Sequence, residues 1–158
     1  MKIGWCLTLF FFAASVQALT LTDDSGQAVH LPAPAQRIIT LTPHATELMF
    51  AVGAGQQVVG AVDYSDYPAA AEKIPRVGGY SGLNIEAILA LQPDLIIYWP
   101  EGNPAREIQR LKQLQLPLYA SDPNSFSDIM QSLRRFGELS GHPRQGVAAA
   151  QAFQQSLS

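Results

Sequence analysis

Residues 60–99 read GAVDYSDYPAAAEKIPRVGGYSGLNIEAILALQPDLIIYW, and this stretch decides the fold. A short apolar run at residues 58–62 leads into it, and a second apolar run at residues 95–99 ends it. Short runs rich in β-branched residues are typical of parallel strands covered on both faces. One helix and two turn-rich loops fit between the runs. The stretch therefore predicts two strands of a parallel sheet.

The two predicted loops carry tyrosines. Tyr64 follows the first strand directly, within Tyr-Ser-Asp-Tyr-Pro, and Tyr80 lies in the glycine-bounded segment 78–83. Both loops are expected on the side of the sheet where the strands have their carboxyl ends, which is where open α/β sheets bind ligands. Flat amphipathic rings supply broad contact area there at low entropic cost. We therefore predict that Tyr64 and Tyr80 contact a ligand, whereas Tyr67 is expected to pack beneath its loop.

The rest of the chain repeats the alternation of strand and helix. Predicted strands cover residues 37–41, 57–62, 94–99 and 116–120, and each is followed by a helical pattern. Asn84 starts one helix as an N-cap, and Asn103 with Pro104 is expected to cap the next. The following helix should bury one face, made of Phe126, Ile129, Met130, Leu133, Phe136 and Leu139. This order predicts a doubly wound, mostly parallel α/β sheet, whose strand order the pattern leaves open.

The N-terminal residues have the pattern of a secretory signal peptide. Lys2 precedes an apolar run that is too short to span a bilayer, and small residues end it at Ala18. We therefore expect residues 1–18 to be removed by cleavage after Ala18 and the rest to reach the periplasm. Cys6, the only cysteine, falls in the removed part, so neither disulfides nor thiolate sites are predicted. Residues 19–36 are interpreted as a small β-hairpin and a linker.

The charge pattern and the motifs favour a binding protein over an enzyme. The formal net charge is −3 and no basic run occurs, so nucleic acid is not an expected partner. No nucleophile elbow, phosphate loop or zinc-binding His-Glu-x-x-His motif is present. Ser65 and Asp66 come nearest to a catalytic pair, but no histidine lies beside them in sequence. We therefore predict no enzymatic activity.

Three further residues on the same edge are candidates for function. His44 falls in the first turn of a helix, where a lone histidine is usually solvated or hydrogen-bonded, and no metal site is predicted. Trp99 ends the third strand, where it either lines the crevice or covers the sheet, and the pattern slightly favours the cover. Glu86, in a first helical turn, compensates the helix dipole. His44 and Trp99 are kept as candidate ligand contacts.

Three segments together resemble a known family. They are residues 37–47, residues 59–68 and residues 83–97, and they resemble the extracytoplasmic substrate-binding proteins of ABC importers for cobalamin, haem and iron siderophores. Tyr-Ser-Asp-Tyr-Pro, the segment 80–86 and Trp99 before Gly102 look most like the vitamin B12-binding members.

The resemblance implies a lobe and a ligand. Residues 37–141 would form the N-terminal lobe of a two-lobed protein, and residues 142–158 would start the helix that bridges the lobes, with the second lobe missing. Tyr64 and Tyr80 would contact the corrin ring, and Glu86 would dock on arginines of the membrane permease. Cobalamin would be the transported ligand, with no resident cofactor.

Three alternatives stay open on the sequence alone. The chain could bind haem or a siderophore, with His44 or a tyrosinate as an iron ligand. It could dock on a permease through Glu86 without any ligand. It could also be a small exported hydrolase that uses Ser65.

Overall fold

The computed structural model describes residues 17–158. Residues 1–16, and with them most of the predicted signal peptide and Cys6, lie outside the described residues. Within residues 17–158, no helix has the length and apolar composition needed to cross a membrane.

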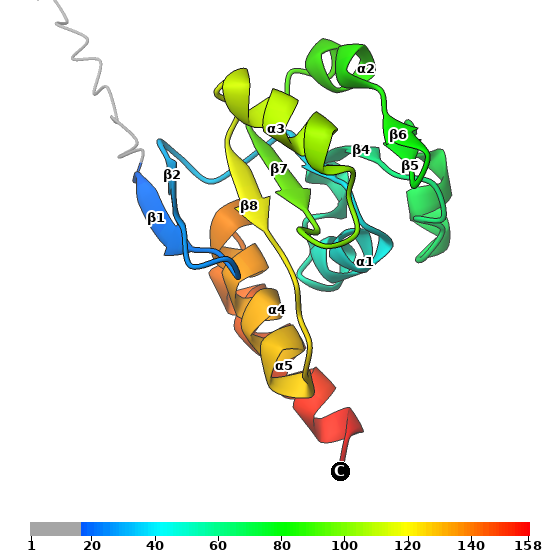
Figure 1. Cartoon of the computed structure of the whole chain (residues 1–158). Helices are drawn as coiled ribbons and strands as arrows, with labels where there is room; N and C mark the ends of the chain where they lie inside the picture. Colours follow the sequence, from blue (N-terminus) through cyan, green and yellow to red (C-terminus); the bar gives the residue numbers. More distant parts are fainter. Residues whose placement is uncertain (1–16) are drawn as a thin grey trace, which may run out of the picture.

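A four-stranded parallel sheet forms the centre of the molecule (Figure 1). Its strands run in the order β4-β3-β7-β8, and their bounds are β3 Ile38–Thr40, β4 Val58–Ala61, β7 Leu95–Tyr98 and β8 Leu118–Ala120. All four residues of β7 are buried, as expected for a strand covered on both faces. The predicted strands and the parallel sheet are therefore confirmed.

Helices cover both faces of the sheet (Figure 1). One face packs against α1, α4 and α5, and the other against α2 and α3; the bounds are α1 Pro43–Ala51, α2 Ile85–Ala90, α3 Ala105–Gln113, α4 Phe126–Ser140 and α5 Pro143–Ser156. Alternate residues of one strand serve the two layers: Ile97 belongs to the first core and Ile96 to the second. The doubly wound α/β class is thus confirmed.

Helices α4 and α5 pack closely against each other. Gly137 and Gly146 meet at their contact, where a Cβ added to Gly137 would lie 2.8 Å from the Cα of Gly146. Gly141, with a φ of 79°, ends α4 in the left-handed conformation that glycine adopts without strain. The inner side of α4 is buried as predicted, but Phe126 is not: it is 61% exposed and stacks edge-on against Phe153 of α5. Phe126 is the first residue of α4, and it does not belong to the buried core that the later turns of the helix join.

Of the two predicted helix N-caps, one is confirmed and one is wrong. Asn84 accepts a hydrogen bond from the backbone N of Ala87 at 2.9 Å, so the predicted cap of α2 is confirmed. Asn103 does not cap α3. Its side chain accepts from Trp99 N at 2.7 Å and donates to Leu41 O at 2.7 Å instead, because the sheet edge offers it two backbone partners.

The N-terminal hairpin lies beside the edge strand β8. Its strands are β1 Leu19–Thr22 and β2 Ala28–Leu31, paired antiparallel. The turn between them is attached to β8, since Asp24 N donates to Ala120 O at 3.1 Å and Ala120 N donates to Asp23 Oδ2 at 3.1 Å. Short elements fill the remaining connections: η1 Gly55–Gln57, η2 Ala69–Lys73, β5 Gly78–Gly79 and β6 Gly82–Leu83.

The strand order contains one reversal. From β3 the chain passes through α1 to β4 on one side, and it then crosses to β7 on the other side of β3. Connections on either side of such a point leave a crevice beyond the carboxyl ends of the two strands, where open α/β sheets bind ligands. In this fold the point lies between β3 and β7.

Candidate functional site

A pocket occupies this reversal point. The ends of β3, β4 and β7 contribute to it, together with the turn between β5 and β6, and its lining residues are Leu41, Thr42, Pro43, Val62, Asp63, Gly79, Tyr80, Trp99 and Asn103. Its cavity volume is about 10 Å³, close to the space that one water molecule needs. We call it the Tyr80 pocket. Its walls come from four separate parts of the chain, so only the folded sheet assembles it.

The two tyrosine loops are joined at this edge. Asp63 N donates a hydrogen bond to Gly78 O at 2.9 Å, which links the loop after β4 to the β5–β6 turn. Gly79 packs against the Asp63 carboxylate so closely that an added Cβ would overlap it. Tyr64 follows Asp63, and Tyr80 follows Gly79. The structure therefore brings the two predicted tyrosine loops to the same edge.

Both tyrosine rings are free of the core. Tyr64 is 73% exposed and Tyr80 is 70% exposed. Side chains this exposed are more often polar or charged than aromatic. Tyr64 also has a φ of 65°, which is unusual for a bulky residue. Backbone strain of this kind costs about 1–3 kcal/mol and gathers at ligand sites. The prediction that Tyr67 packs beneath its loop is wrong: its side chain is 70% exposed.

Arg76 ties the Tyr64 loop to η2. Its guanidinium donates to Ser65 O at 2.9 Å and to Ala71 O at 3.1 Å, and it forms an ion pair with Asp66 at 3.0 Å. Backbone acceptors that are spread over the loop are thus held by one side chain. Strained backbone conformations persist where the surrounding structure restrains them, and the bonds of Arg76 to Ser65 and Asp66 restrain the residues that follow Tyr64. No sequence pattern indicated this role for Arg76.

Trp99 lines the Tyr80 pocket, contrary to the slight preference for a cover over the sheet. Its backbone N donates to Asn103 Oδ1, and its indole Nε1 donates to Asp122 Oδ1 at 3.0 Å. Gly102 lies directly against the ring. The indole is therefore held by its hydrogen bond to Asp122 and by its close contact with Gly102. Asp122 was missed, although it follows β8 and so falls on the edge where all the candidate residues lie.

His44 is held by two hydroxyl groups. Its Nδ1 lies 2.7 Å from Thr42 Oγ1, and its Nε2 lies 3.3 Å from the buried Ser121 Oγ. Burial lowers the pKa of His44 from its usual 6.5, while the carboxylates of Asp122 and Asp24 act in the opposite direction. The imidazole is therefore neutral at pH 7, and both nitrogens are engaged. This arrangement leaves no ring nitrogen free for a metal.

The remaining candidates differ in exposure. Glu86 is exposed in the first turn of α2 and does not line the Tyr80 pocket. Ser65 is 1% exposed, and its hydroxyl has no hydrogen-bond partner among residues 17–158. A nucleophile must reach its substrate, so this position does not suit a hydrolase. Among the same residues, no group of three or more His, Cys, Asp or Glu side chains could hold a metal ion.

The chain matches a known protein family over most of its length. The model of that family, described as periplasmic binding protein, matches residues 38–158. This span includes every strand of the main sheet and the five α-helices found in residues 17–158.

Similar proteins and solved structures agree with this match. A vitamin B12-binding protein of Vibrio parahaemolyticus is 41% identical over 99% of this chain and 52% of its own length. The crystal structure of the periplasmic vitamin B12 binding protein of Vibrio cholerae is 44% identical, with a TM-score of 0.75 over 78% of this chain and 49% of that one. A periplasmic heme binding protein from Pseudomonas aeruginosa is 26% identical, with a TM-score of 0.71 over 78% and 44%. The chain thus spans about half the length of these relatives.

Proposed function

Because the chain belongs to the periplasmic binding protein family, we propose that it is a ligand-binding lobe for cobalamin in the periplasm. It would deliver the vitamin to the membrane permease of an ABC importer. The protein acts by shape and aromatic contact and carries out no catalysis. Similarity to vitamin B12-binding proteins at 41–44% identity supports cobalamin as the ligand.

The observation that carries the proposal is the set of aromatic rings at the reversal point of the sheet. Tyr64 and Tyr80 are exposed to solvent, and Tyr80 and Trp99 both line the Tyr80 pocket. Exposed rings at a ligand edge are the kind of surface that a broad, flat, largely apolar molecule covers. A corrin ring has this shape.

Three tyrosine variants test the proposal by calorimetric titration of cyanocobalamin. Tyr64→Ala and Tyr80→Ala should each weaken binding by about tenfold, which corresponds to about 1.4 kcal/mol. Tyr67→Ala is the matched control, because Tyr67 is equally exposed and stands in the same loop as Tyr64. Equal loss in all three variants, or loss in none, would contradict the proposal.

Haem or an iron siderophore is the second candidate, since heme binding proteins share the fold at 26% identity. Iron coordination through His44 would require breaking its bonds to Thr42 and Ser121. We expect the haem absorption spectrum to be the same after mixing haemin with the parent chain or with His44→Ala. His30→Ala, which changes an exposed histidine, serves as the control. A Soret shift that only His44→Ala removes would favour haem.

Permease docking through Glu86 is proposed as a separate step. The carboxylate is exposed at the start of α2, where the helix dipole tolerates it and a basic partner can reach it. Glu86→Lys should abolish association with the permease while cyanocobalamin titrations stay unchanged. Glu47→Lys changes an exposed carboxylate on α1 and should have no effect on association.

A further inference from the structure

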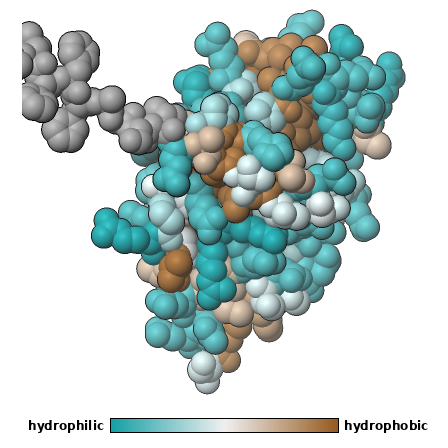
Figure 2. All heavy atoms as spheres, turned by 90° about the vertical axis from the view of Figure 1, so that its left-hand side faces the viewer, coloured by the Kyte–Doolittle hydropathy of each residue, from teal (hydrophilic) through white to brown (hydrophobic). Residues whose placement is uncertain are grey.

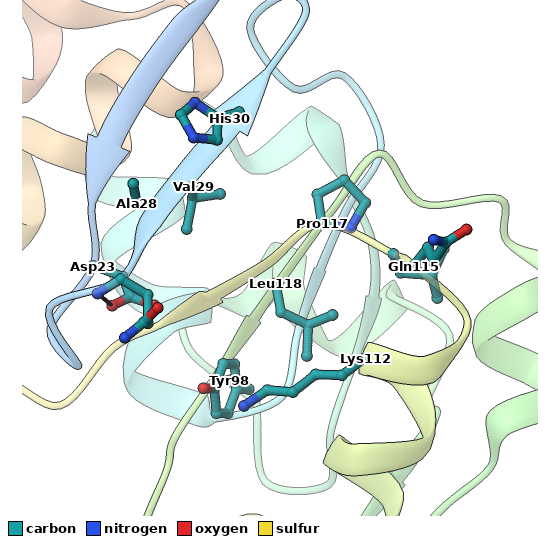
Figure 3. Close-up of a pocket in the computed structure, with 11 residues that line it drawn as sticks. Asp23, Ala28, Val29, His30, Tyr98, Lys112, Gln115, Pro117 and Leu118 are labelled. Atoms are coloured by element: carbon teal, nitrogen blue, oxygen red, sulfur yellow. Dashed lines mark hydrogen bonds between the residues drawn. The ribbon is translucent and has the colours of Figure 1, made fainter.

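A second pocket lies between the N-terminal hairpin and the outer edge of the main sheet (Figure 3). One wall is β2, with Ala28, Val29 and His30, and the other is the segment 115–118 that leads into β8. We call this pocket the β2–β8 slot. It holds about 380 Å³, which lies in the usual range for ligand sites. Figure 2 views the side of the molecule that carries the hairpin and shows apolar atoms framed by hydrophilic ones.

The β8 wall of the slot has unpaired backbone groups. The ladder to β7 uses alternate residues, since Ile96 N donates to Pro117 O and Ser121 N donates to Tyr98 O. By the same alternation, Leu118 and Ala120 direct their N–H and C=O groups away from β7. The hairpin turn already binds both groups of Ala120. Leu118 is left with an outward donor and acceptor that have no partner among residues 17–158.

The β2 wall also has backbone groups that its partner strand leaves unpaired. Asp23 N donates to Gln27 O at the hairpin turn, and the register places Leu21 opposite Val29. Antiparallel pairs alternate between bonded and non-bonded, so Ala28 and His30 turn their N–H and C=O groups away from β1. No residue of β1 lines the slot, whereas Ala28 and His30 do. Two free strand edges therefore face one space.

The slot also contains a cation that lacks a counter-charge. Lys112 Nζ lies over the ring of Tyr98, 5.5 Å from its centroid (Figure 3), and such a contact holds an ammonium in place. Among residues 17–158, no carboxylate lies within ion-pair distance of it. The nearby Asp23 carboxylate is occupied by Ser25, Gln27 and Ala120. The slot thus combines strand-pairing groups with one available positive charge.

From these features we propose that the β2–β8 slot binds an extended polypeptide segment that carries a carboxylate. The segment adds as a strand between β8 and β2 and pairs with the outward groups of Leu118, Ala28 and His30. It places its carboxylate on Lys112. Strand addition to a free sheet edge is an established mode of peptide recognition, in which backbone bonds give affinity and a side-chain contact gives selectivity. The surface is separate from the Tyr80 pocket and does not depend on cobalamin binding.

The probe is the acetylated, amidated pentapeptide Thr-Val-Glu-Val-Thr, titrated into isotopically labelled chain at low salt. Amide signals of Ala28, His30 and Leu118 should shift and saturate. Lys112→Gln should weaken binding about twofold to fivefold, the range of an exposed ion pair. Lys73→Gln is the matched control, since it removes an equal charge from the exposed end of η2, and it should leave the affinity unchanged.

Two further measurements separate strand pairing from simple anion binding. The same peptide with N-methylated backbone amides should not shift these signals, because it has lost its donors. Ala28→Pro removes an N–H that faces the slot and leaves the β1–β2 ladder intact, as an edge strand allows, and it should also weaken binding. Absence of shifts with the unmodified peptide would overturn the proposal. So would equal shifts with the N-methylated peptide or with sodium acetate alone.

Discussion

Replacing Gly102 with alanine tests how tightly Trp99 is held. An added Cβ would overlap Cε3, Cζ3 and Cδ2 of the indole, all well inside the ordinary contact range of 3.4–4 Å. The ring must therefore leave its position, and its hydrogen bond to Asp122 is lost. Overpacking of this kind costs about 1–3 kcal/mol, which corresponds to a fall in Tm of about 3 to 10 °C for a domain of this size.

Tryptophan fluorescence reports on this packing directly, because Trp5 and Trp99 are the only tryptophans of the chain. In protein prepared from residue 19 onward, all indole fluorescence comes from Trp99. We expect Gly102→Ala to shift the emission toward that of solvated indole and to lower the affinity for cyanocobalamin. Glu101→Ala, at the exposed neighbouring position, should change neither. If Gly102→Ala kept the parent emission and Tm, the described packing of Trp99 would be wrong.

The other predictions concern the network around the same edge. Asp122→Leu should shift the Trp99 emission, because the indole N–H loses its acceptor, whereas Asp122→Asn retains an acceptor oxygen and should give the parent spectrum. Burial lowers the pKa of His44 below 6.5, so the unfolded state binds a proton more readily than the folded state. The free energy of unfolding should therefore fall as the pH drops below 6.5. In urea titrations, His44→Gln should make this fall with pH less steep. Burial raises the pKa of Tyr119 to about 12, so the unfolded state loses this proton more readily than the folded state. The free energy of unfolding should therefore fall as the pH rises above 10. Tyr119→Phe should remove the ionisation step near 12 from an absorbance titration. Arg76→Met should make the Tyr64 loop mobile, with faster amide hydrogen exchange at Ser65 and Asp66 but little change in Tm.

The secondary structure was predictable because local patterns determine it. The strands of the sheet read as apolar runs since both their faces are buried, and β7, with four buried residues, shows this directly. The cap of α2 was predictable because Asn84 bonds to a backbone group only three residues away. Patterns that involve only residues close together in the chain can be recognised in the sequence itself.

Features that depend on distant contacts were not predictable. Asn103 has the local pattern of a helix cap, but a carbonyl 62 residues earlier in the chain recruits its amide. Phe126 fits the apolar period of α4, yet the helix begins beyond the core layer and leaves it exposed. Strand order and the β2–β8 slot likewise depend on which elements meet in three dimensions.

The candidate site shows the same difference between local patterns and distant contacts. Tyr64 and Tyr80 were predictable as exposed rings because each follows an apolar or glycine-bounded segment at one edge of the sheet. The residues that support them were not predictable. Arg76 binds three carbonyls and a carboxylate of the loop region, and Asp122 bonds to Trp99 from 23 residues away. The residues that would touch a ligand thus show in the sequence, while those that position them appear only in the folded chain.

Mapping cyanocobalamin onto the chain by amide chemical shifts tests the central claim most directly. We predict that the perturbed signals gather at Tyr64, Tyr80 and Trp99, with the neighbouring Asp63 and Gly79, and that the β2–β8 slot stays unchanged. Perturbations centred on the slot, or none at any cyanocobalamin concentration, would contradict the account.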